Sequence, residues 1–137
     1  MWRQMTTASA VLQSITVKAS AAGNMIVTVA RQVNYRHTQG TQGAWCMGLS
    51  QKSGDAGACT PMAGSSAGAR NYVAASVPST VSGYSALDGY SIVQIYQVIS
   101  GGLYTFYLNG YMSGFSSAYL FQPSMTAQFV SGTLASK

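Results

Sequence analysis

Acidic side chains are nearly missing from this sequence. Asp55 and Asp88 are its only side-chain carboxylates, glutamate is absent, and His37 is the single histidine. Acid–base, nucleophilic and metal-assisted catalysis each need such groups close together. Both aspartates stand in glycine-containing turns, where Asp commonly shapes a loop, and His37 has no second histidine or acid beside it in the sequence. We therefore expect no enzymatic activity, no metal site and no cofactor, and we interpret His37 as a solvated loop residue.

The seven lysines and arginines do not cluster. They are scattered from Arg3 to Lys137, and the net charge of +5 arises because acids are missing. A nucleic-acid groove or a basic membrane patch would gather such residues together, so we expect neither partner. Charged residues make up only 7% of the chain, and such a surface repels its own copies weakly, which favours homo-oligomers and larger assemblies.

Long hydrophobic runs and cysteines are also scarce. No apolar stretch approaches the roughly 18 residues of a membrane span, and no signal-peptide core is visible. We expect no membrane insertion and a place on a virion or another extracellular surface. Cys46 and Cys59 are the two cysteines, without the histidine spacing of a zinc site. They are either two buried thiols or, if the chain matures outside the cell, a disulfide bridge.

Alternation of apolar and polar residues dominates what is present. Hydrophobic residues form 47% of the chain, and a period of two is typical of strands with one buried face. We expect an all-β antiparallel sandwich or jelly roll of about eight strands over residues 10–131, with an N-terminal arm over 1–9 and a C-terminal tail over 132–137. The predicted buried faces contain Met25, Val27, Val29, Val33 and Tyr35, then Trp45, Met47 and Leu49, then Phe106, Leu108 and Met112.

Two turns predict hairpins. Gly101-Gly102 separates the apolar run 91–99 from the strand that begins near Tyr104, and adjacent glycines supply the positive φ angles of a tight hairpin loop. We therefore expect these two runs to pair antiparallel. The turn over residues 21–24, which contains a Gly and an Asn, likewise returns the chain from a first strand to the long strand over 25–36.

Five tyrosines crowd the strands on either side of Gly101-Gly102. The core of one small sandwich is too small to cover all five, and a subunit interface buries tyrosines at low cost in side-chain entropy. Arg31 interrupts an apolar strand face; its stem either lies along the sheet, or it sits at a subunit boundary paired with Asp88 or with backbone carbonyls. Trp2 is expected to pack on its own domain or on a neighbouring subunit. The expected interface residues are Arg31, Tyr90, Tyr96, Tyr104, Tyr107 and Tyr111.

Polar, glycine-rich loops are the expected contact regions. The segments 38–43, 51–68 and 113–117 connect strands, and loops of this kind carry binding functions when a rigid scaffold positions them. The candidate contact residues in and near these loops are Gln39, Gln42, Lys52, Asp55, Tyr84, Phe115 and Tyr119.

Three segments together resemble a known family. They are ITVKASAAGNMIVTVARQVNY at 15–35, GGLYTFYLNGYMSG at 101–114 and SMTAQFV at 124–130. In this order they resemble the tumour-necrosis-factor/complement-type jelly roll, in the short version found in bacterial proteins and in phage fibre or virion-surface proteins. The resemblance implies a homotrimer around a threefold axis and apical loops that bind receptors or glycans. This sequence departs from the family pattern in showing no visible collagen-like or coiled-coil stalk.

These features lead to two hypotheses for function. The first is a non-enzymatic structural or attachment protein of a phage or virion surface, such as a fibre tip, a head decoration or a minor capsid protein, whose partners are its own copies, other virion proteins and host-surface glycans or receptors. The second is a secreted lectin-like or cytokine-like module that recognises glycans or a receptor through its apical loops.

Overall fold

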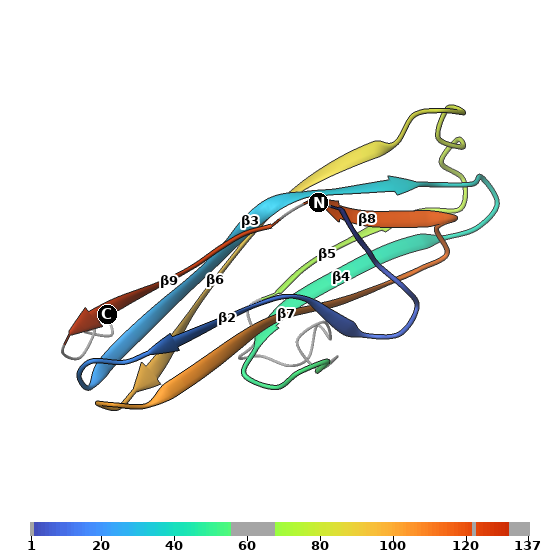
Figure 1. The fold of residues 1–137 in the computed structure, drawn as a ribbon. Coiled ribbons are helices and arrows are strands. Elements are labelled where there is room, and N and C mark those ends of the chain that lie inside the picture. Colours follow the sequence, from blue (N-terminus) through green and yellow to red (C-terminus); the bar gives the residue numbers. More distant parts are fainter. Residues whose placement is uncertain (1, 56–67, 122, 132–137) are drawn as a thin grey trace.

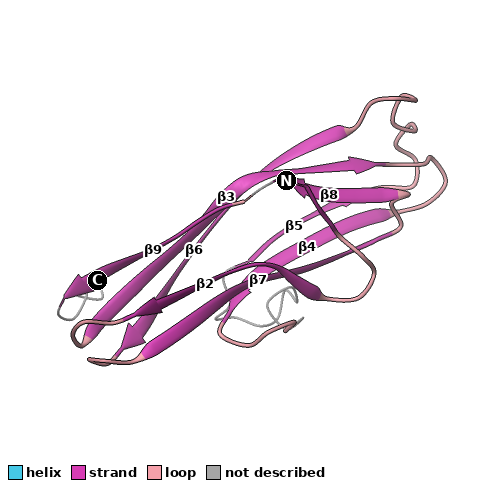
Figure 2. Ribbon diagram, in the orientation of Figure 1, coloured by secondary structure: helices cyan, strands magenta, loops and turns pink. Residues whose placement is uncertain are grey.

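The computed structural model describes residues 2–55, 68–121 and 123–131. These residues form nine strands in two antiparallel sheets that stack face to face, and none of them lies in a helix (Figures 1 and 2). The prediction of an all-β antiparallel sandwich is confirmed. The strands are β1 (Trp2–Gln4), β2 (Ala10–Lys18), β3 (Gly23–Arg36), β4 (Gly43–Ser50), β5 (Gly68–Val73), β6 (Ala86–Val98), β7 (Leu103–Ser113), β8 (Ser117–Phe121) and β9 (Ser124–Ser131).

The strand pairs are nested around the middle of the chain. β4 pairs with β5, β3 with β6, β2 with β7 and β1 with β8. Sheet A has the order β1-β8-β3-β6, with β9 also paired to β3, and sheet B has the order β2-β7-β4-β5. The long β3 pairs with β9 over Gly23–Ala30 and with β8 over Val33–Arg36. Sheet A therefore has two halves along β3, one completed by β9 and the other by β8 and β1.

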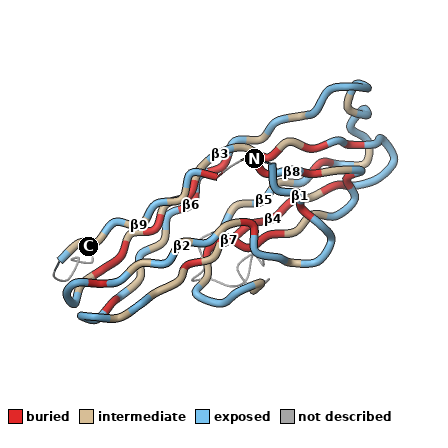
Figure 3. The backbone as a smooth tube through the Cα atoms, viewed as in Figure 1, coloured by how far each residue is buried: buried red, intermediate tan, exposed pale blue. Residues whose placement is uncertain are grey.

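The core lies between the two inner faces and follows the predicted alternation. Figure 3 shows buried stretches in strands of both sheets. Val27, Val29 and Val33 of β3 are fully buried, as are Met47 and Phe106 of sheet B, and all five belong to one hydrophobic cluster. The remaining predicted core positions are buried as well, apart from Met112, which is partly buried against the core. The predicted buried faces of β3, β4 and β7 are therefore confirmed.

Asp88 links the two sheets. We expected Asp88 in a turn, but it lies within β6. Its Oδ2 accepts hydrogen bonds from Trp45 Nε1 and Asn71 Nδ2, both at 2.7 Å. The donors belong to β4 and β5, so one carboxylate joins the edge of sheet A to sheet B. Hydrogen bonds to a charged acceptor are stronger than those between neutral groups.

Both predicted hairpins are wrong. β6 pairs with β3 in sheet A, whereas β7 pairs with β2 and β4 in sheet B, so Gly101-Gly102 carries the chain between sheets. β2 and β3 also lie in different sheets. The two turns meet at one end of the sandwich, where Gly101 N–H donates to Ala19 O (2.8 Å) and Ala19 N–H donates to Gly102 O (2.9 Å). Gly101 does have a positive φ of 77°, but this backbone shape serves a corner between sheets as well as a hairpin.

The N-terminal segment joins the sandwich from residue 2 onward. We expected an arm, but Trp2–Gln4 pair with β8, Met5 is fully buried, and Met5 N–H donates to Ala118 O at 2.8 Å. The centroids of the Trp2 and Phe121 rings lie 4.7 Å apart. Backbone pairing and the burial of Met5 hold this segment to the sheet, and Trp2 packs against Phe121 of its own domain while it stays 48% exposed.

Candidate functional site

The outer face of sheet A, which is turned away from sheet B, carries almost no charge. Directly opposite residues of paired strands point to the same face, so the register identifies the members of this face. Arg36, at the end of β3, is the charged residue among its described members. They are Trp2, Gln4, Asn24, Ile26, Thr28, Ala30, Gln32, Asn34, Arg36, Leu87, Gly89, Ser91, Val93, Ile95, Gln97, Ser117, Tyr119, Phe121, Ser124, Thr126, Gln128 and Val130.

Large apolar side chains stand exposed on this face. Leu87, Val93 and Ile95 of β6 are 59%, 53% and 48% exposed, and Trp2 is 48% exposed. Ile26 of β3 lies opposite Ile95 and is partly exposed. A shallow hollow of about 290 Å³ is lined by Trp2, Asn34, Ser85 and Tyr119. Val93, Ile95 and Ile26 are neighbours on this face, whereas Gly89 and Ser91 separate them from Leu87. Exposed apolar side chains grouped on a face with little charge favour an interaction surface.

The strand β6 also has an open edge. It is a long strand of 13 residues, and within the described part of the chain it pairs on one side only, with β3. An open edge exposes unpaired backbone N–H and C=O groups and invites pairing with another chain. The apolar face and the open edge therefore meet on the same strand.

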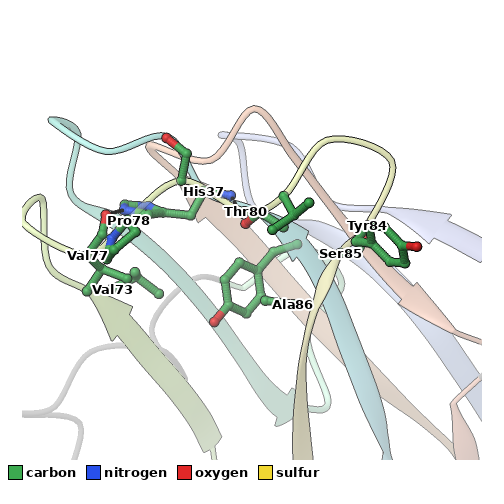
Figure 4. Close-up of a pocket in the computed structure, with 11 residues that line it drawn as sticks. His37, Val73, Val77, Pro78, Thr80, Tyr84, Ser85 and Ala86 are labelled. Carbon is green, nitrogen blue, oxygen red and sulfur yellow. Dashed lines mark hydrogen bonds between the residues drawn. The ribbon is translucent and has the colours of Figure 1, made fainter.

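A pocket of about 460 Å³ opens at one end of the sandwich (Figure 4). The connections β3–β4, β5–β6 and β7–β8 gather at this end, on the right in Figure 1. The β5–β6 connection supplies most of the wall, and the ends of β3, β5 and β6 supply the rest. The lining residues are Tyr35, His37, Val73, Val77, Pro78, Ser79, Thr80, Val81, Tyr84, Ser85 and Ala86.

His37 fixes one side of this pocket. It is only 4% exposed, which corrects the expectation of a solvated histidine. Its Nε2 lies 3.0 Å from Val77 O, and because a carbonyl only accepts, Nε2 is the protonated nitrogen. Its backbone N–H donates to Thr80 Oγ1 (2.9 Å), and Thr80 N–H donates back to His37 O (2.9 Å). His37 Nδ1 is buried and has no hydrogen-bond partner among the described residues.

The five predicted interface tyrosines do not share one surface. Tyr90 is buried in the core of its own domain, and Tyr96 and Tyr104 lie partly buried against that core. Tyr107 and Tyr111 point to the outer side of sheet B, opposite Ser14 and Cys46 respectively. The tyrosines therefore lie on opposite sides of sheet B, and a single flat interface does not contain all of them.

Burial changes the acidity of the inner tyrosines. It raises the pKa of Tyr90, an effect that the positive charge of Arg31 opposes, and it raises the pKa of Tyr96. Burial, and then the negative charge of Asp88, raise the pKa of Tyr35. Arg31 lies directly opposite Tyr90 in the β3–β6 ladder and is exposed. These tyrosines thus stay neutral and act as packing residues.

The predicted contact residues fall into three places. Gln39, Gln42 and Tyr84 lie at the pocket end, where Gln39 N–H donates to Ser79 Oγ at 2.9 Å and Gln42 and Tyr84 are exposed. Phe115 lies at the same end but is buried, and the centroid of its ring lies 4.5 Å from that of Tyr35. It is therefore a core residue and not a solvent-exposed contact residue.

Lys52 and Asp55 lie over the outer side of sheet B. Asn109 Nδ2 donates to Lys52 O at 2.9 Å, and Asn109 Oδ1 accepts from Gly54 N–H at 3.0 Å. Asp55 Oδ2 accepts from Ser50 Oγ at 3.3 Å. This backbone segment covers Asn109, which is fully buried. Tyr119 is in the third place, on the outer face of sheet A beside the hollow of 290 Å³.

Cys46 is buried in β4, and Cys59 lies outside the described residues, so the disulfide stays a prediction. Over residues 2–55, 68–121 and 123–131 the structure contains no cluster of three or more His, Cys, Asp or Glu side chains that could hold a metal ion. The same residues contain no helix long and apolar enough to cross a membrane.

The sequence analysis missed the apolar outer face of β6, although a signal was present. In SIVQIYQV at 91–98, apolar residues occupy both parities, since Val93 and Ile95 alternate with Ile92, Tyr96 and Val98. A strand that is apolar on both sides is typical of a sheet covered on both faces. Val77 and Val81 at the pocket were also missed, because isolated valines in a loop give no periodic signal.

Comparisons with known proteins add no relative. A scan against protein-family models, a search of curated proteins and a search of solved structures each find no match to this chain.

Proposed function

We propose that this chain is a non-enzymatic structural and attachment protein that works as a rigid homotrimer on a phage or virion surface, as a fibre tip, a head decoration or a minor capsid protein. The outer face of sheet A, which has little charge, carries this proposal. Such a face is stable when a second protein surface covers it, and a second copy of the same chain is the occupant that its neutral composition fits best.

The exposed apolar residues give this face a clear driving force. Leu87, Val93 and Ile95 are each about half exposed, and complete burial of such a side chain contributes about 1.5–3 kcal/mol. Covering the exposed halves of all three therefore contributes roughly 2–4 kcal/mol per protomer. Arg36 is the one charged residue among the described members of this face. Assembly would therefore remove little charge from water, and the desolvation cost that opposes it would be small.

The open edge of β6 and the adjacent outer face of sheet A are two different surfaces on one protomer. If the edge of one copy contacts the face of the next, the contact is heterologous, and it forms a ring where the rotation closes and an open filament where it does not. The resemblance to tumour-necrosis-factor/complement-type proteins implies that this ring has three members. The nested pairing of β1 with β8, β2 with β7, β3 with β6 and β4 with β5 supports the jelly-roll assignment, because a jelly roll is a long hairpin wound into two sheets.

The pocket at the loop end favours the second candidate function, a secreted lectin-like or cytokine-like module. Pockets of about 300–1,000 Å³ with mostly apolar walls and a few polar groups are typical of ligand sites, and this one measures about 460 Å³. A secreted module of this kind would bind its ligand without needing assembly into a particle.

The solution mass of the purified protein separates the two candidates. Sedimentation velocity at micromolar concentration is expected to give three times the 14.3 kDa chain mass, with no dependence of assembly on added glycans. A stable, folded protein of single-chain mass would contradict the structural proposal. If that monomer also showed saturable glycan binding, the lectin-like module would be the better account.

A further inference from the structure

The rim of the loop-end pocket is apolar and exposed. Val77, Val81 and Tyr84 are 42%, 69% and 70% exposed, and all three line the same pocket within the β5–β6 connection. Figure 4 shows Tyr84 and Ser85 on one side of the opening and Val77, Pro78 and Val73 on the other. Three exposed apolar side chains around one opening offer a ligand more apolar contact than scattered surface residues would.

The pocket is held in shape before any ligand arrives. The β5–β6 connection is fastened to the end of β3 by the three hydrogen bonds of His37 described above. It is also fastened by Gln39 N–H to Ser79 Oγ (2.9 Å), Gln39 Nε2 to Ser76 O (3.3 Å) and Gly40 N–H to Ala75 O (2.8 Å). A site fixed in this way loses little conformational entropy on binding.

The chemistry of the walls selects a neutral ligand. Among the described residues, those that line the pocket include no Lys, Arg, Asp or Glu. They therefore offer no opposite charge to a phosphate, a carboxylate or an ammonium group. Its polar groups are hydroxyls. Ser79 Oγ and Thr80 Oγ1 each accept a backbone N–H, which leaves the proton of each hydroxyl as a donor. Ser85 and Tyr84 add two further hydroxyls near the opening.

We propose that this pocket binds a single neutral sugar ring, presented as the terminal unit of a glycan chain. A pyranose has one apolar face of C–H groups and a rim of uncharged hydroxyls. Its C–H face packs on the Tyr84 ring and on Val81, while its hydroxyls meet Ser79, Thr80 and Ser85. This inference rests on the attachment role proposed above, because it names the chemistry to which the protein attaches.

The affinity of one pocket is expected to be weak. A few hydrogen bonds and one apolar contact on an open site correspond to a dissociation constant of about 1 mM. Three pockets carried by one rigid trimer would raise the apparent affinity for a surface dense in such glycans by a factor of about 100 or more. A weak single site is therefore compatible with firm attachment to a cell or particle surface.

Saturation-transfer NMR on the purified full chain tests this proposal. The probes are methyl glycosides of neutral hexoses and N-acetylhexosamines, with the methyl glycoside of sialic acid as the charged comparison. We expect saturation transfer to the ring protons of at least one neutral glycoside and none to sialic acid. Tyr84→Ala should weaken binding by about tenfold, whereas Tyr72→Ala, which truncates a tyrosine 56% exposed on sheet B, should leave it unchanged.

Three results would overturn the proposal. They are an absence of saturation transfer from the wild-type protein to every neutral glycoside, a preference for sialic acid, and a Tyr84→Ala variant that binds as tightly as the wild type. Measuring the sedimentation mass of each variant distinguishes a failure of the sugar site from a failure of the proposed trimer. Tyr84→Ala leaves the outer face of sheet A untouched, so loss of sugar binding with an unchanged mass supports the sugar site alone. Sugar binding by a protein of single-chain mass supports the pocket and refutes the trimer.

Discussion

Placing one lysine on the outer face of sheet A should separate assembly from folding. Ile95 is 48% exposed in the protomer, so a lysine at this position can keep its ammonium group in water while its stem lies along the sheet. We therefore expect Ile95→Lys to change the free energy of unfolding of the protomer by no more than about 1 kcal/mol. In the proposed trimer the same position would be covered, and the substitution would bring one buried charge into each protomer.

The cost of that charge sets the expected effect on assembly. Burying an unpaired ion costs several kcal/mol, and an increase on the order of 4 kcal/mol weakens an association about a thousandfold. Sedimentation velocity at micromolar concentration should therefore find Ile95→Lys at the single-chain mass of 14.3 kDa. Ser14→Lys adds the same charge to an exposed position on sheet B and should assemble as the wild type does. An Ile95→Lys protein that keeps the wild-type mass would refute the assignment of this face.

Three further predictions concern the stability of the protomer, each measured by urea unfolding in the Ile95→Lys background, where no assembly is expected to add to stability. Asp88→Ala removes the acceptor of Trp45 Nε1 and should lower the free energy of unfolding by about 1–3 kcal/mol; an unchanged midpoint would show that the link between sheets adds nothing. Gly110→Ala places a methyl group 2.8 Å from the backbone oxygen of Cys46 and should lower the free energy of unfolding by about 1–3 kcal/mol. Gly89→Ala, where nothing lies within 4 Å of the added methyl group, is the control. Because burial raises the pKa of Tyr90, the folded state holds this proton more tightly than the unfolded state, and stability should fall as the pH rises above about 10. Tyr90→Phe should reduce this alkaline loss, and an identical pH profile for the two proteins would contradict the reasoning.

The local pattern of the sequence predicted which side chains are buried. A period of two in β3 and β4 identified Val27, Val29 and Met47 as core residues, and the structure confirms them. Burial of one strand face depends on side chains close together in sequence, so periodicity reports it directly. The same pattern correctly gave an antiparallel sandwich.

Strand partners were not predictable in the same way. The glycines at 101 and 102 allow a tight reversal of the chain, and a reversal suits a hairpin and a corner between two sheets equally well. Whether these glycines form a hairpin or a corner depends on the partners of the flanking strands. β6 pairs with β3 and β7 pairs with β2, and both partners lie far away in sequence. Only long-range packing settles it.

Two candidate site residues show how context overrides residue type. Phe115 follows a glycine in a connection and was predicted to be a contact residue, but it stacks on Tyr35 in the core. His37 follows a strand and was predicted to be solvated, but the β5–β6 connection covers it. In both cases the covering element comes from a distant part of the chain, so the sequence near the residue carries no sign of it.

Hydroxyl-radical footprinting of the intact protein tests the central claim most directly, because it reports whether another copy covers the outer face of sheet A. Trp2 and Leu87 lie on that face, whereas Tyr72 lies on sheet B, and all three are about half exposed in the protomer. In the assembled protein, Trp2 and Leu87 should be oxidised far more slowly than in an Ile95→Lys monomer, while Tyr72 should react equally in both. Oxidation of Trp2 and Leu87 at the monomer rate in the wild-type protein would contradict the account.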